Sequence, residues 1–554
     1  MIVLRKNGKV EKKQQYWLVS ILVITVLAFS SGFANGFTAW DDIDYLLANP
    51  MLKDVSVNGL KNIFTSFANA NYHPLTTLSN LLEFQLFGMK QGVFFAGNLL
   101  LHLLNTFLVF RFVFLLSKQF YTALITALFF GIHPLHVESV TWLSERKDVL
   151  YAFFFLLSLI FYLKYKQQND YKHLIYCFVL FCCSLLSKSA AVVLPLVMLL
   201  IDFYASPQEV RKYLKDKIPF LLFSFIFGIV AIKAQASGNA LDSLIFGYLD
   251  RFFLVSYSLV FYIFKAFLPF NLSALHPYPE KLTWVHYISP VLLSLLTFLA
   301  YSASFIRKEI IFGGLFFIIN LVLVLQFVPI GQAIVAERYT YMSYIGLFFI
   351  VGQLYSYWAA QKSDYQYYLI VATVIFALFF TFTTWQRNRV WKDQATLFAD
   401  VAQKYPRSYT AYLNLGNDKQ DKKDFFGAVQ YYDKALAISP KLALGLYNRG
   451  TAKYALQDWN GALADFEEAL KINEKNPDIW NNLAGVKFQL KDYQGAIVCY
   501  GKVIALDSNF ADVYRNRGMG YFKLEQLDKA CADWHIAADF GNEDVQKFIS
   551  KYCK

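Results

Sequence analysis

The chain has 554 residues, of which 56% are hydrophobic and 18% aromatic, and it carries a formal net charge of +12. Its mean hydropathy of +0.36 is high for a chain whose C-terminal third is polar. Apolar runs such as Ile310 to Val328 and Tyr367 to Trp385 approach the roughly 20 residues needed to cross a bilayer. These features exclude a soluble enzyme and predict a polytopic membrane protein.

The positive net charge does not indicate a nucleic-acid partner, because much of it flanks apolar runs. Five basic residues stand directly before the first run: Arg5, Lys6, Lys9, Lys12 and Lys13. Positive charge at this place keeps the N-terminus in the cytoplasm. No cleavage pattern follows the run from Trp17 to Phe29, so we expect a retained anchor.

Eleven apolar segments follow one another along the first 385 residues. They are centred near residues 25, 105, 128, 157, 180–200, 227, 260, 297, 319, 351 and 376. A polar insert from Thr38 to Gln91 separates the first two, and its amphipathic pieces, Leu60 to Phe67 and Leu78 to Phe87, are expected to lie along the membrane surface. The sequence predicts a membrane domain over residues 1–385 with about 11 spans and an external loop at 38–91.

The segment 174–201 decides the topology. One tilted crossing is favoured over two short ones broken at Ser187-Lys188-Ser189, because each half would have only about 13 residues. Eleven crossings put the C-terminus outside. Lys164 to Lys172, Arg307-Lys308 and Lys362 then face the cytoplasm, as positively charged loops should, but Arg211 to Lys217 would face out.

From about Pro406 the sequence repeats every 34 residues. Asparagines share one register (Asn414, Asn448, Asn482, Asn516), alanines a second (Ala428, Ala462, Ala496, Ala530), and small residues a third (Gly416, Gly450, Ala484, Gly518). This period and pattern are specific to tetratricopeptide repeats. We predict a linker helix at 386–405, then four repeats and a capping helix, Glu543 to Lys554, within 406–554.

The six cysteines show no metal-ligand spacing. Cys177, Cys182 and Cys183 lie in an apolar segment and are expected to be small core residues. Cys531 and Cys553, 22 residues apart, could pair if the C-terminus is exported.

Asp41 and Asp42 follow Trp40 at the outer end of the first span, with Asp44 close behind. Acidic residues at a membrane boundary can be merely solvated. Carboxylates held beside lipid have raised pKa values, however, and a raised pKa suits a general base.

A second cluster, expected on the same face, runs from His133 to Glu138 and continues as Glu145-Arg146-Lys147-Asp148. Two histidines with a nearby glutamate could suggest zinc, but Pro134 interrupts the helix and no HExxH pattern is present. Arg146 and Lys147 are better suited to bind an anion at headgroup level, and snorkelling to the interface is the alternative.

Two further groups could carry chemistry. Glu337-Arg338-Tyr339 precedes an apolar run and could be either functional or a salt-bridged interfacial belt. Lys188 is the only charge deep within its segment, and an intramembrane charge is a functional candidate that needs a partner.

These residues resemble a known family. Six short stretches and the repeat array are similar to the transmembrane and tetratricopeptide-repeat O-mannosyltransferases. The stretches are Trp40-Asp41-Asp42, Asn71 to Leu75, Leu101 to Asn105, His133 to Glu138, Ser187-Lys188 and Ala336 to Tyr339. The resemblance covers nearly the whole chain. It implies a C-type glycosyltransferase fold, a polyprenyl-phosphate sugar donor, an acceptor hydroxyl and an acidic catalytic residue in the first external loop.

On this basis the chain is expected to be an enzyme that moves a sugar, with mannose the first expectation, from a polyprenyl phosphate to a protein hydroxyl at the outer membrane face. The expected site residues fall into three groups: catalytic Asp41, Asp42 and Glu138; phosphate-binding Arg146, Arg338 and Lys188; and supporting His73, His136, Glu337 and Tyr339. No metal ligand is assigned and no cofactor is required, with a divalent cation between carboxylates left open. The membrane is expected to be a bacterial inner membrane or the endoplasmic reticulum, with the repeats outside the cytoplasm binding a polypeptide.

The family often has Arg where His73 stands and an acidic residue where Ser189 stands, so the sugar is not fixed by the resemblance. The rival interpretations are a membrane-anchored scaffold that recruits partners without catalysis and a transporter. A transporter should show internal symmetry among its spans and charges at the membrane midplane. A scaffold has no reason to gather Asp41, Asp42 and Glu138 on one face.

Overall fold

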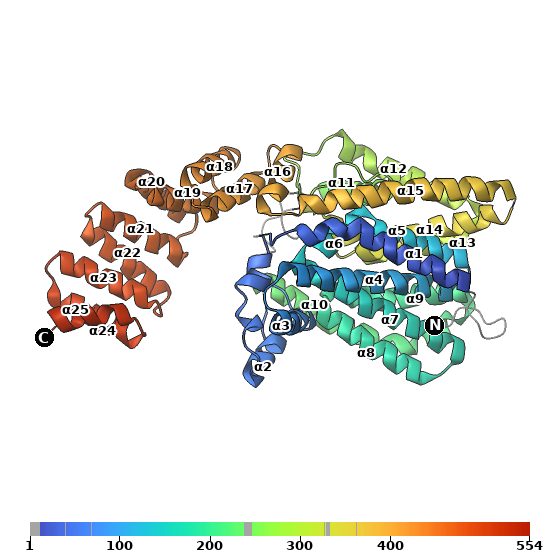
Figure 1. Ribbon diagram of the computed structural model, residues 1–554, viewed down its shortest axis with the longest axis horizontal. Helices are drawn as coiled ribbons and strands as arrows, with labels where there is room; N and C mark the ends of the chain where they lie inside the picture. Colours follow the sequence, from blue (N-terminus) through green and yellow to red (C-terminus); the bar gives the residue numbers. More distant parts are fainter. Residues whose placement is uncertain are drawn as a thin grey trace. The chain divides into compact units, whose positions relative to one another are not determined.

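The computed structural model describes residues 12–38, 40–67, 69–237, 246–325, 327, 333–361 and 363–553. The described residues are mostly helical, with one short antiparallel pairing of β1 (His276–Pro277) with β2 (Ala333–Val335). The chain divides into two compact units, residues 1–397 and 398–554, which are described separately below (Figure 1). The predicted class, an all-α membrane bundle followed by a tetratricopeptide solenoid, is confirmed.

The long helices of the first unit run alongside one another (Figure 1). The helices before the break at Lys188 are α1 (Lys12–Phe29), α2 (Val57–Thr65), α3 (Pro74–Phe87), α4 (Gln91–Ser117), α5 (Phe120–Ile132), α6 (Val137–Thr141), α7 (Arg146–Gln168) and α8 (Tyr171–Ser187). After it come α9 (Leu194–Ala205), α10 (Ile218–Ser237), α11 (Tyr248–Lys265), α12 (Trp284–Ser302), α13 (Arg307–Leu321), α14 (Thr340–Ala359), α15 (Ser363–Val390) and α16 (Gln394–Lys404), the last of which spans the division between the units.

Among the described residues, six helical segments are long and apolar enough to cross a membrane, or seven if the bent pair α5–α6 is one span. Shorter apolar helices such as α8 and the segment Ser189–Ala205 accompany them. The predicted count of about 11 crossings therefore stays a prediction.

The favoured interpretation of residues 174–201 as one continuous crossing is wrong. Helix α8 ends at Ser187, Lys188 is extended, and the chain turns before α9 begins at Leu194. Lys188 contacts Asp148 at the start of α7, whereas Asp202 in α9 accepts a hydrogen bond of 2.6 Å from Tyr162, about 21 Å further along α7 at 1.5 Å per residue. Helices α8 and α9 therefore run in opposite directions, and each half is short because it packs against α7 or its neighbours rather than spanning alone.

A second difference from the predicted topology lowers the number of crossings, whereas the first raises it. The apolar run near residue 260 forms α11, and its flanking rings Phe246 and Tyr278 meet at 6.2 Å. Between them the Ala266 carbonyl lies 3.3 Å from Nε2 of the buried His133. The segment thus enters the bundle and returns to the end from which it came, instead of crossing.

These two changes act in opposite directions on the number of crossings, so an odd number of crossings stays a prediction. They also remove the conflict over the basic loop from Arg211 to Lys217. Tyr165, near the end of α7, donates a hydrogen bond of 2.8 Å to Asp216, and the Lys166 ammonium lies 3.7 Å from the centroid of the Tyr213 ring. That loop therefore lies at the same end of α7 as Lys164 and Lys166, as the positive-inside rule requires.

Several residues of the topology argument lie outside the described part of the chain. These are Arg5, Lys6, Lys9 and Lys362, together with the side chains of Lys12 and Lys13.

The second unit consists of antiparallel helix pairs. They are α17 (Tyr409–Asp421) with α18 (Phe425–Ile438), α19 (Ala443–Ala455) with α20 (Trp459–Ile472), α21 (Pro477–Gln489) with α22 (Tyr493–Leu506), and α23 (Ala511–Lys523) with α24 (Leu527–Asp539). In each of the first three pairs an aspartate caps the second helix by accepting from a glycine N–H, at Asp424, Asp458 and Asp492. A Cβ on that glycine would lie within 2.5 Å of the capping carboxylate, so glycine lets the aspartate keep this capping position.

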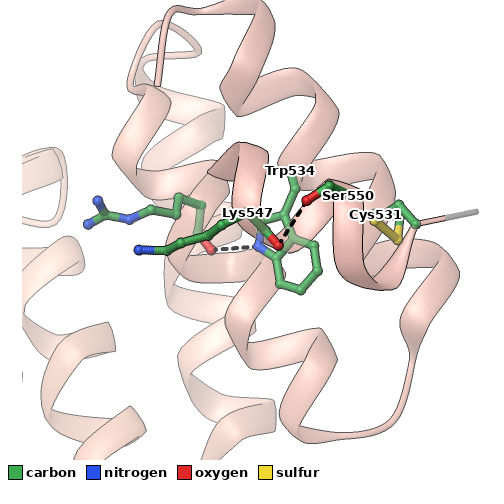
Figure 2. Close-up of a disulfide and its surroundings, with 6 residues drawn as sticks. Cys531, Trp534, Lys547 and Ser550 are labelled. Carbon is green, nitrogen blue, oxygen red and sulfur yellow. Dashed lines mark hydrogen bonds between the residues drawn. A yellow bond between two sulfur atoms is a disulfide. The ribbon is translucent and has the colours of Figure 1, made fainter. Parts of the chain in front are cut away.

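The array ends in helix α25 (Gln546–Tyr552), and the last residue, Lys554, lies outside the described part. A disulfide joins Cys531 of α24 to Cys553, close to Trp534 (Figure 2). The Trp534 ring stacks on Phe548, with ring centroids 5.1 Å apart. Trp534 also donates a hydrogen bond to the Arg515 carbonyl, so it ties α25 and α24 to α23. A disulfide of this kind is typical of proteins in oxidising compartments.

Candidate active site

Irregular segments gather at one end of the membrane unit and enclose a cavity of about 250 Å³. They come from positions far apart in the sequence, between the long helices. The lining residues are Asp41, Tyr45, Asn69, Asn71, His73, Glu145, Lys147, Lys188, Ser189, Gln235, Leu323, Val324, Arg338 and Tyr339.

The segment between α5 and α7 is bent back into the bundle. The axes of α5 and the Pro134–Thr141 segment differ by 52°, because Pro134 has no N–H to continue the helix. A second short turn, Leu143–Glu145, leads directly into α7. These two turns bury Glu138 and Glu145 at the level where α7 begins.

Asp41 and Asp42 have different surroundings. Asp42 is 1% exposed and accepts three hydrogen bonds, from the backbone N–H and hydroxyl of Thr38 at 2.9 Å each and from the Ser144 N–H at 3.0 Å. Burial raises the pKa of Asp42, and the Thr38 and Ser144 donors oppose that effect. Asp42 therefore fastens the first external loop to the turn before α7.

Asp41 instead lines the cavity. Burial raises the pKa of Asp41 above its ordinary value of 3.8, and the nearby Lys147 ammonium partly opposes this. Trp40, beside it, stacks on Trp142 with ring centroids 4.8 Å apart, which fixes the backbone that carries the carboxylate. Of the two carboxylates, only Asp41 can meet a ligand in the cavity.

Glu145 holds three cations around the cavity. Its carboxylate lies 3.0 Å from the Lys147 ammonium, 3.9 Å from the Lys188 ammonium and 3.5 Å from Nε of Arg338. Lys188 and Arg338 remain about one-fifth exposed. Since a lysine has three donors and an arginine five, each cation keeps hydrogen-bonding capacity for an anion.

Two further carboxylates hold these cations in place from outside the cavity. Asp148 pairs with Lys188 and also accepts a hydrogen bond of 3.0 Å from Ser139. The fully buried Glu138 pairs with the Arg338 guanidinium and accepts from the Arg338 N–H at 3.0 Å. Glu138 therefore positions Arg338 and does not itself line the cavity.

Besides Asp42 and Glu138, three more of the predicted site residues do not line the cavity. Arg146 turns away, pairing with Glu83 at 2.5 Å and donating to Asn98 at 2.8 Å. His136 is buried among aromatic rings, 2.8 Å from the Phe130 carbonyl. Glu337 is buried against His276 at 3.7 Å and Arg387 at 3.4 Å. None of the three lines the cavity, so Lys147 takes the place expected of Arg146.

His73 and Tyr339 do line the cavity. Burial lowers the pKa of His73 well below 6.5, and Lys147 and Lys188 lower it further, so the imidazole is neutral at physiological pH. Its buried Nδ1 has no hydrogen-bond partner among the described residues. A neutral imidazole with a free nitrogen suits a ligand hydroxyl better than a ligand anion.

The loop at Asn69 and Ala70 closes one wall in a strained conformation. Both residues have positive φ angles, 46° and 57°, which is uncommon for a non-glycine residue and costs roughly 1–2 kcal/mol for one such as Ala70. Gln235 at the end of α10 donates to the Ala70 carbonyl and to the Asn71 side chain, at 3.2 Å each. Such strain is common where backbone shape serves a ligand.

Sequence reasoning missed Glu145, Tyr45, Asn71 and Gln235 as lining residues, and it named Lys147 as an anion-binding candidate without preferring it to Arg146. Glu145 and Lys147 were visible as part of a charged run at the start of α7. Successive residues on a helix point about 100° apart, so Arg146 and Lys147 cannot both face one cavity, and the sequence does not say which does. Gln235 gives no signal at all, because it is a polar residue at an ordinary helix end.

Among the described residues, no group of three or more His, Cys, Asp or Glu side chains is placed to hold a metal ion. The lining of the cavity instead combines two carboxylates with three cations, an arrangement that can bind an anion beside a base.

Comparison with known proteins agrees with this division of the chain. Residues 74–233 match the family described as Dolichyl-phosphate-mannose-protein mannosyltransferase. Residues 410–441, 450–490 and 486–525 match tetratricopeptide repeat families. The mannosyltransferase match begins at helix α3, directly after His73. It includes the segments that carry Glu138, Glu145, Lys147 and Lys188.

Curated proteins of similar sequence include several protein O-mannosyl-transferases. The human Protein O-mannosyl-transferase TMTC1 is 24% identical over 453 residues, which are 70% of this chain and 50% of that protein. The human Protein O-mannosyl-transferase TMTC3 is 22% identical, over 76% of this chain and 51% of that protein. A 106-residue stretch is 36% identical to the mouse Protein O-mannosyl-transferase TMTC2. The chain spans about half the length of the first two.

Among solved structures, crystal structures of MamA (20% identity, TM-score 0.26, covering 27% of this chain and 89% of that one) and of YrrB (22%, 0.26, 27% and 79%) resemble the chain. At these TM-scores neither bears on function. The family resemblance predicted from the sequence is confirmed by the two domain matches together: the chain is a relative of the transmembrane and tetratricopeptide-repeat protein O-mannosyltransferases.

Proposed function

We propose that the chain transfers mannose from a polyprenyl-phosphate donor to a hydroxyl of a polypeptide, in the cavity at the outer end of the bundle. One observation carries the proposal: Asp41 shares a cavity with three cations, Lys147, Lys188 and Arg338, which all lie within 4 Å of the Glu145 carboxylate. A membrane-anchored scaffold has no use for such a cavity.

Asp41 is the general base. In an inverting transfer the carboxylate takes the proton of the acceptor hydroxyl, whose oxygen forms a bond to the anomeric carbon while the bond from that carbon to the phosphate oxygen breaks. The elevated pKa of Asp41 brings the carboxylate closer to the pH at which it works, which makes it a more effective base.

The three cations stabilise the departing lipid phosphate. Negative charge grows on the phosphate oxygens as the glycosidic bond breaks, and fixed cations aimed at that place act without reorganising. Glu145 keeps the cations together when no donor is bound and prevents their mutual repulsion from opening the cavity. His73, neutral and with a free Nδ1, is placed to accept or donate a hydrogen bond to a sugar hydroxyl.

The lipid chain of the donor has a route to the cavity. A small crevice of about 30 Å³ shares Asn71, Ser189 and Gln235 with the cavity. Its remaining α10 residues are apolar, namely Phe227, Val230, Ala231 and Ala234. We propose that the lipid chain of the donor leaves the cavity along this apolar side of α10.

The repeats would supply the acceptor, which requires them to lie on the same side of the membrane as Asp41. An odd number of crossings and the Cys531–Cys553 disulfide both support that side, because disulfides persist outside the cytoplasm.

The experiment is a transfer assay on the full chain in lipid nanodiscs, with polyprenyl-phosphate mannose labelled in the sugar and a hydroxyl-bearing polypeptide. We expect label in the polypeptide with the wild type and none above background with Asp41→Asn. Equal transfer by a folded Asp41→Asn protein would overturn the assignment of the base. No transfer of mannose, glucose or galactose from their polyprenyl phosphates would overturn the function.

A further inference from the structure

Two of the irregular segments that form the cavity contact the C-terminal end of α15. Segment 30–42 leads from α1 to Asp41, and segment 137–145 contains α6 and the turn before α7. In the first of these segments the Gly36 N–H donates a hydrogen bond of 2.6 Å to the Lys392 carbonyl, just after α15. Because neither segment contains a long helix, contacts with other elements decide where each one lies.

Aromatic rings connect the same three elements. The Trp142 ring, in segment 137–145, has its centroid 4.8 Å from that of Trp40 and 5.5 Å from that of Trp391, which follows α15. The Arg338 guanidinium lies 5.4 Å from the centroid of the Trp142 ring. Trp142 thus packs against the residue beside Asp41, against one cation of the cavity and against the end of α15.

Asn388, in the last turn of α15, joins these segments by hydrogen bonds. Its fully buried amide accepts a hydrogen bond from the Thr141 hydroxyl and donates to the Ala28 carbonyl near the end of α1, at 3.4 Å. The amide also donates to the Thr384 carbonyl at 2.8 Å, and the Asn388 carbonyl accepts from the Asn35 side chain at 2.9 Å. A buried amide is costly unless it is hydrogen-bonded, so these partners account for an amide in an apolar helix.

Thr141 belongs to the segment whose carboxylates hold the cations of the cavity. Glu138 pairs with Arg338, and the Glu145 carboxylate lies between 3.0 and 3.9 Å from all three cations. Asp41 belongs to the other segment. The position of one segment relative to the other therefore sets the separation between the carboxylate and the cations.

We propose that Asn388 is a positioning residue for sugar transfer: by bonding to Thr141 and to the end of α1, it fixes the separation between Asp41 and the cations. Asn388 does not line the cavity, so it acts through the two segments and not on a ligand. The inference rests on the proposed function, in which Asp41 is the base and the cations bind the donor phosphate. A misplacement of about 1 Å can lower the rate of an enzyme about 10²-fold, so a contact outside the cavity can control the reaction.

The test removes the hydroxyl of Thr141, since Val has nearly the shape of Thr. The transfer assay on the full chain in nanodiscs then gives kcat and the donor KM. We expect Thr141→Val to lower kcat about 10- to 100-fold. The donor KM should change less than about two-fold, because Glu145 still gathers the three cations. Thr141→Ser keeps the hydroxyl and should retain most of the wild-type kcat.

Thr384→Val is the matched control on the same helix. Thr384 lies one turn before Asn388, and its hydroxyl donates a hydrogen bond of 2.7 Å to the Ile132 carbonyl at the end of α5. Thr141 and Thr384 are both buried, so each substitution to Val removes one buried hydroxyl. The two variants should therefore have similar melting temperatures, whereas Thr384→Val should keep the wild-type kcat.

Asn388→Leu removes the same contact from the side of α15 and should also lower kcat. Because both substitutions break one hydrogen bond, the double variant with Thr141→Val should lose little more than the larger of the two single losses. Thr141→Val preserves the shape of the side chain, so it decides the question even if Asn388→Leu does not fold.

Three results would overturn the inference: wild-type kcat in a folded Thr141→Val protein, an equal loss of kcat in Thr384→Val, or single losses that multiply in the double variant. Each of these leaves the proposed function standing. A wild type that transfers no sugar would overturn the proposed function and this inference together, so the two kinds of failure can be told apart.

Discussion

The repeat unit and the cavity end of the membrane unit use charged residues differently. In the repeats the ion pairs are close in sequence: Arg449 lies 2.5 Å from Asp465, and Arg517 lies 2.7 Å from Asp533, each pair 16 residues apart. They join the two helices of one repeat. At the cavity, Arg338 pairs with Glu138, 200 residues away, and both belong to segments between spans.

The difference follows from what surrounds the charges. In the repeats the arginine of each pair is about one-fifth exposed, and the buried Asp465 has a second cation, Lys453, 2.8 Å away, so the loss of Arg449 leaves this carboxylate paired. Charges buried beside lipid are stable only as a complete set, because removing one leaves its partner uncompensated. At the cavity, therefore, the stability of the segments and the proposed chemistry depend on the same few charged residues. In the repeats, stability is distributed over many equivalent contacts.

The largest expected effect separates the two adjacent aspartates. Asp41→Asn should lower the rate of mannose transfer by about 10²–10⁴, the usual loss when a general base is removed, without changing thermal stability. Asp42→Asn should destabilise the protein by about 1–3 kcal/mol, because the new amide group would face N–H and O–H donors. Transfer rates and melting curves of both variants distinguish the roles, and the reverse pattern would assign the base to Asp42.

Arg338 and Arg146 offer a similar contrast among the cations. Arg338→Ala should raise KM for the lipid donor about 10- to 100-fold, which corresponds to a lost hydrogen bond to a charged group, with a smaller change in KM for the acceptor. Arg146→Ala removes a guanidinium that pairs with Glu83 outside the cavity, so it should change stability but not donor KM. An unchanged donor KM in a folded Arg338→Ala protein would show that Arg338 is only structural.

The pH dependence should report the environment of Asp41. Since the base must be ionised and burial raises its pKa, kcat/KM should rise with pH through that raised value and then level off. The Lys147 ammonium lowers this pKa, so Lys147→Met should move the rising limb to higher pH. If the rising limb lies at the same pH in both proteins, it does not report the ionisation of Asp41.

The smallest effect is expected in the repeats. Arg449→Ala removes one of two cations that contact the buried Asp465, and Lys453 remains 2.8 Å from that carboxylate, so the substitution should cost about 1 kcal/mol, or roughly 2–4 °C in Tm for a unit of this size. Transfer with saturating acceptor should not change. A large loss of activity would mean that the repeats do more than hold the acceptor.

The sequence predicted the repeat unit well because its contacts are local. The 34-residue period that sets Asn482 and Asn516 in register also returns in the backbone, at Lys423, Gln457, Lys491 and Glu525, which all have positive φ angles. Each repeat packs only against residues of its own repeat and of the adjacent ones, so the sequence period directly predicts the structural period.

The cavity was predicted only in part because its geometry depends on distant contacts. The charged runs marked Asp41, Lys188 and Arg338 correctly as residues of one end of the bundle. The choice of Lys147 over Arg146 depends on the rotation of α7, which is set by its packing against α4 and α8. The change of chain direction at Lys188 could not be predicted from the lengths of α8 and α9. The length of an apolar segment shows whether it can span the bilayer, but not where the chain turns back.

Above all, we infer that an acceptor held by the repeats reaches Asp41 from the same side of the membrane. Two variants with one added cysteine each test this inference in cells, Asn509→Cys in an exposed turn of the repeats and Lys215→Cys in the basic loop, both with Cys182 and Cys183 changed to Ser. Cys177 and Cys499 are buried, and Cys531 and Cys553 are already joined.

A membrane-impermeant maleimide should label Asn509→Cys in intact cells or sealed right-side-out vesicles, and Lys215→Cys only after permeabilisation. Labelling of Lys215→Cys from outside together with protection of Asn509→Cys would contradict the account, because the repeats would then lie in the cytoplasm, away from the acceptor side of the cavity.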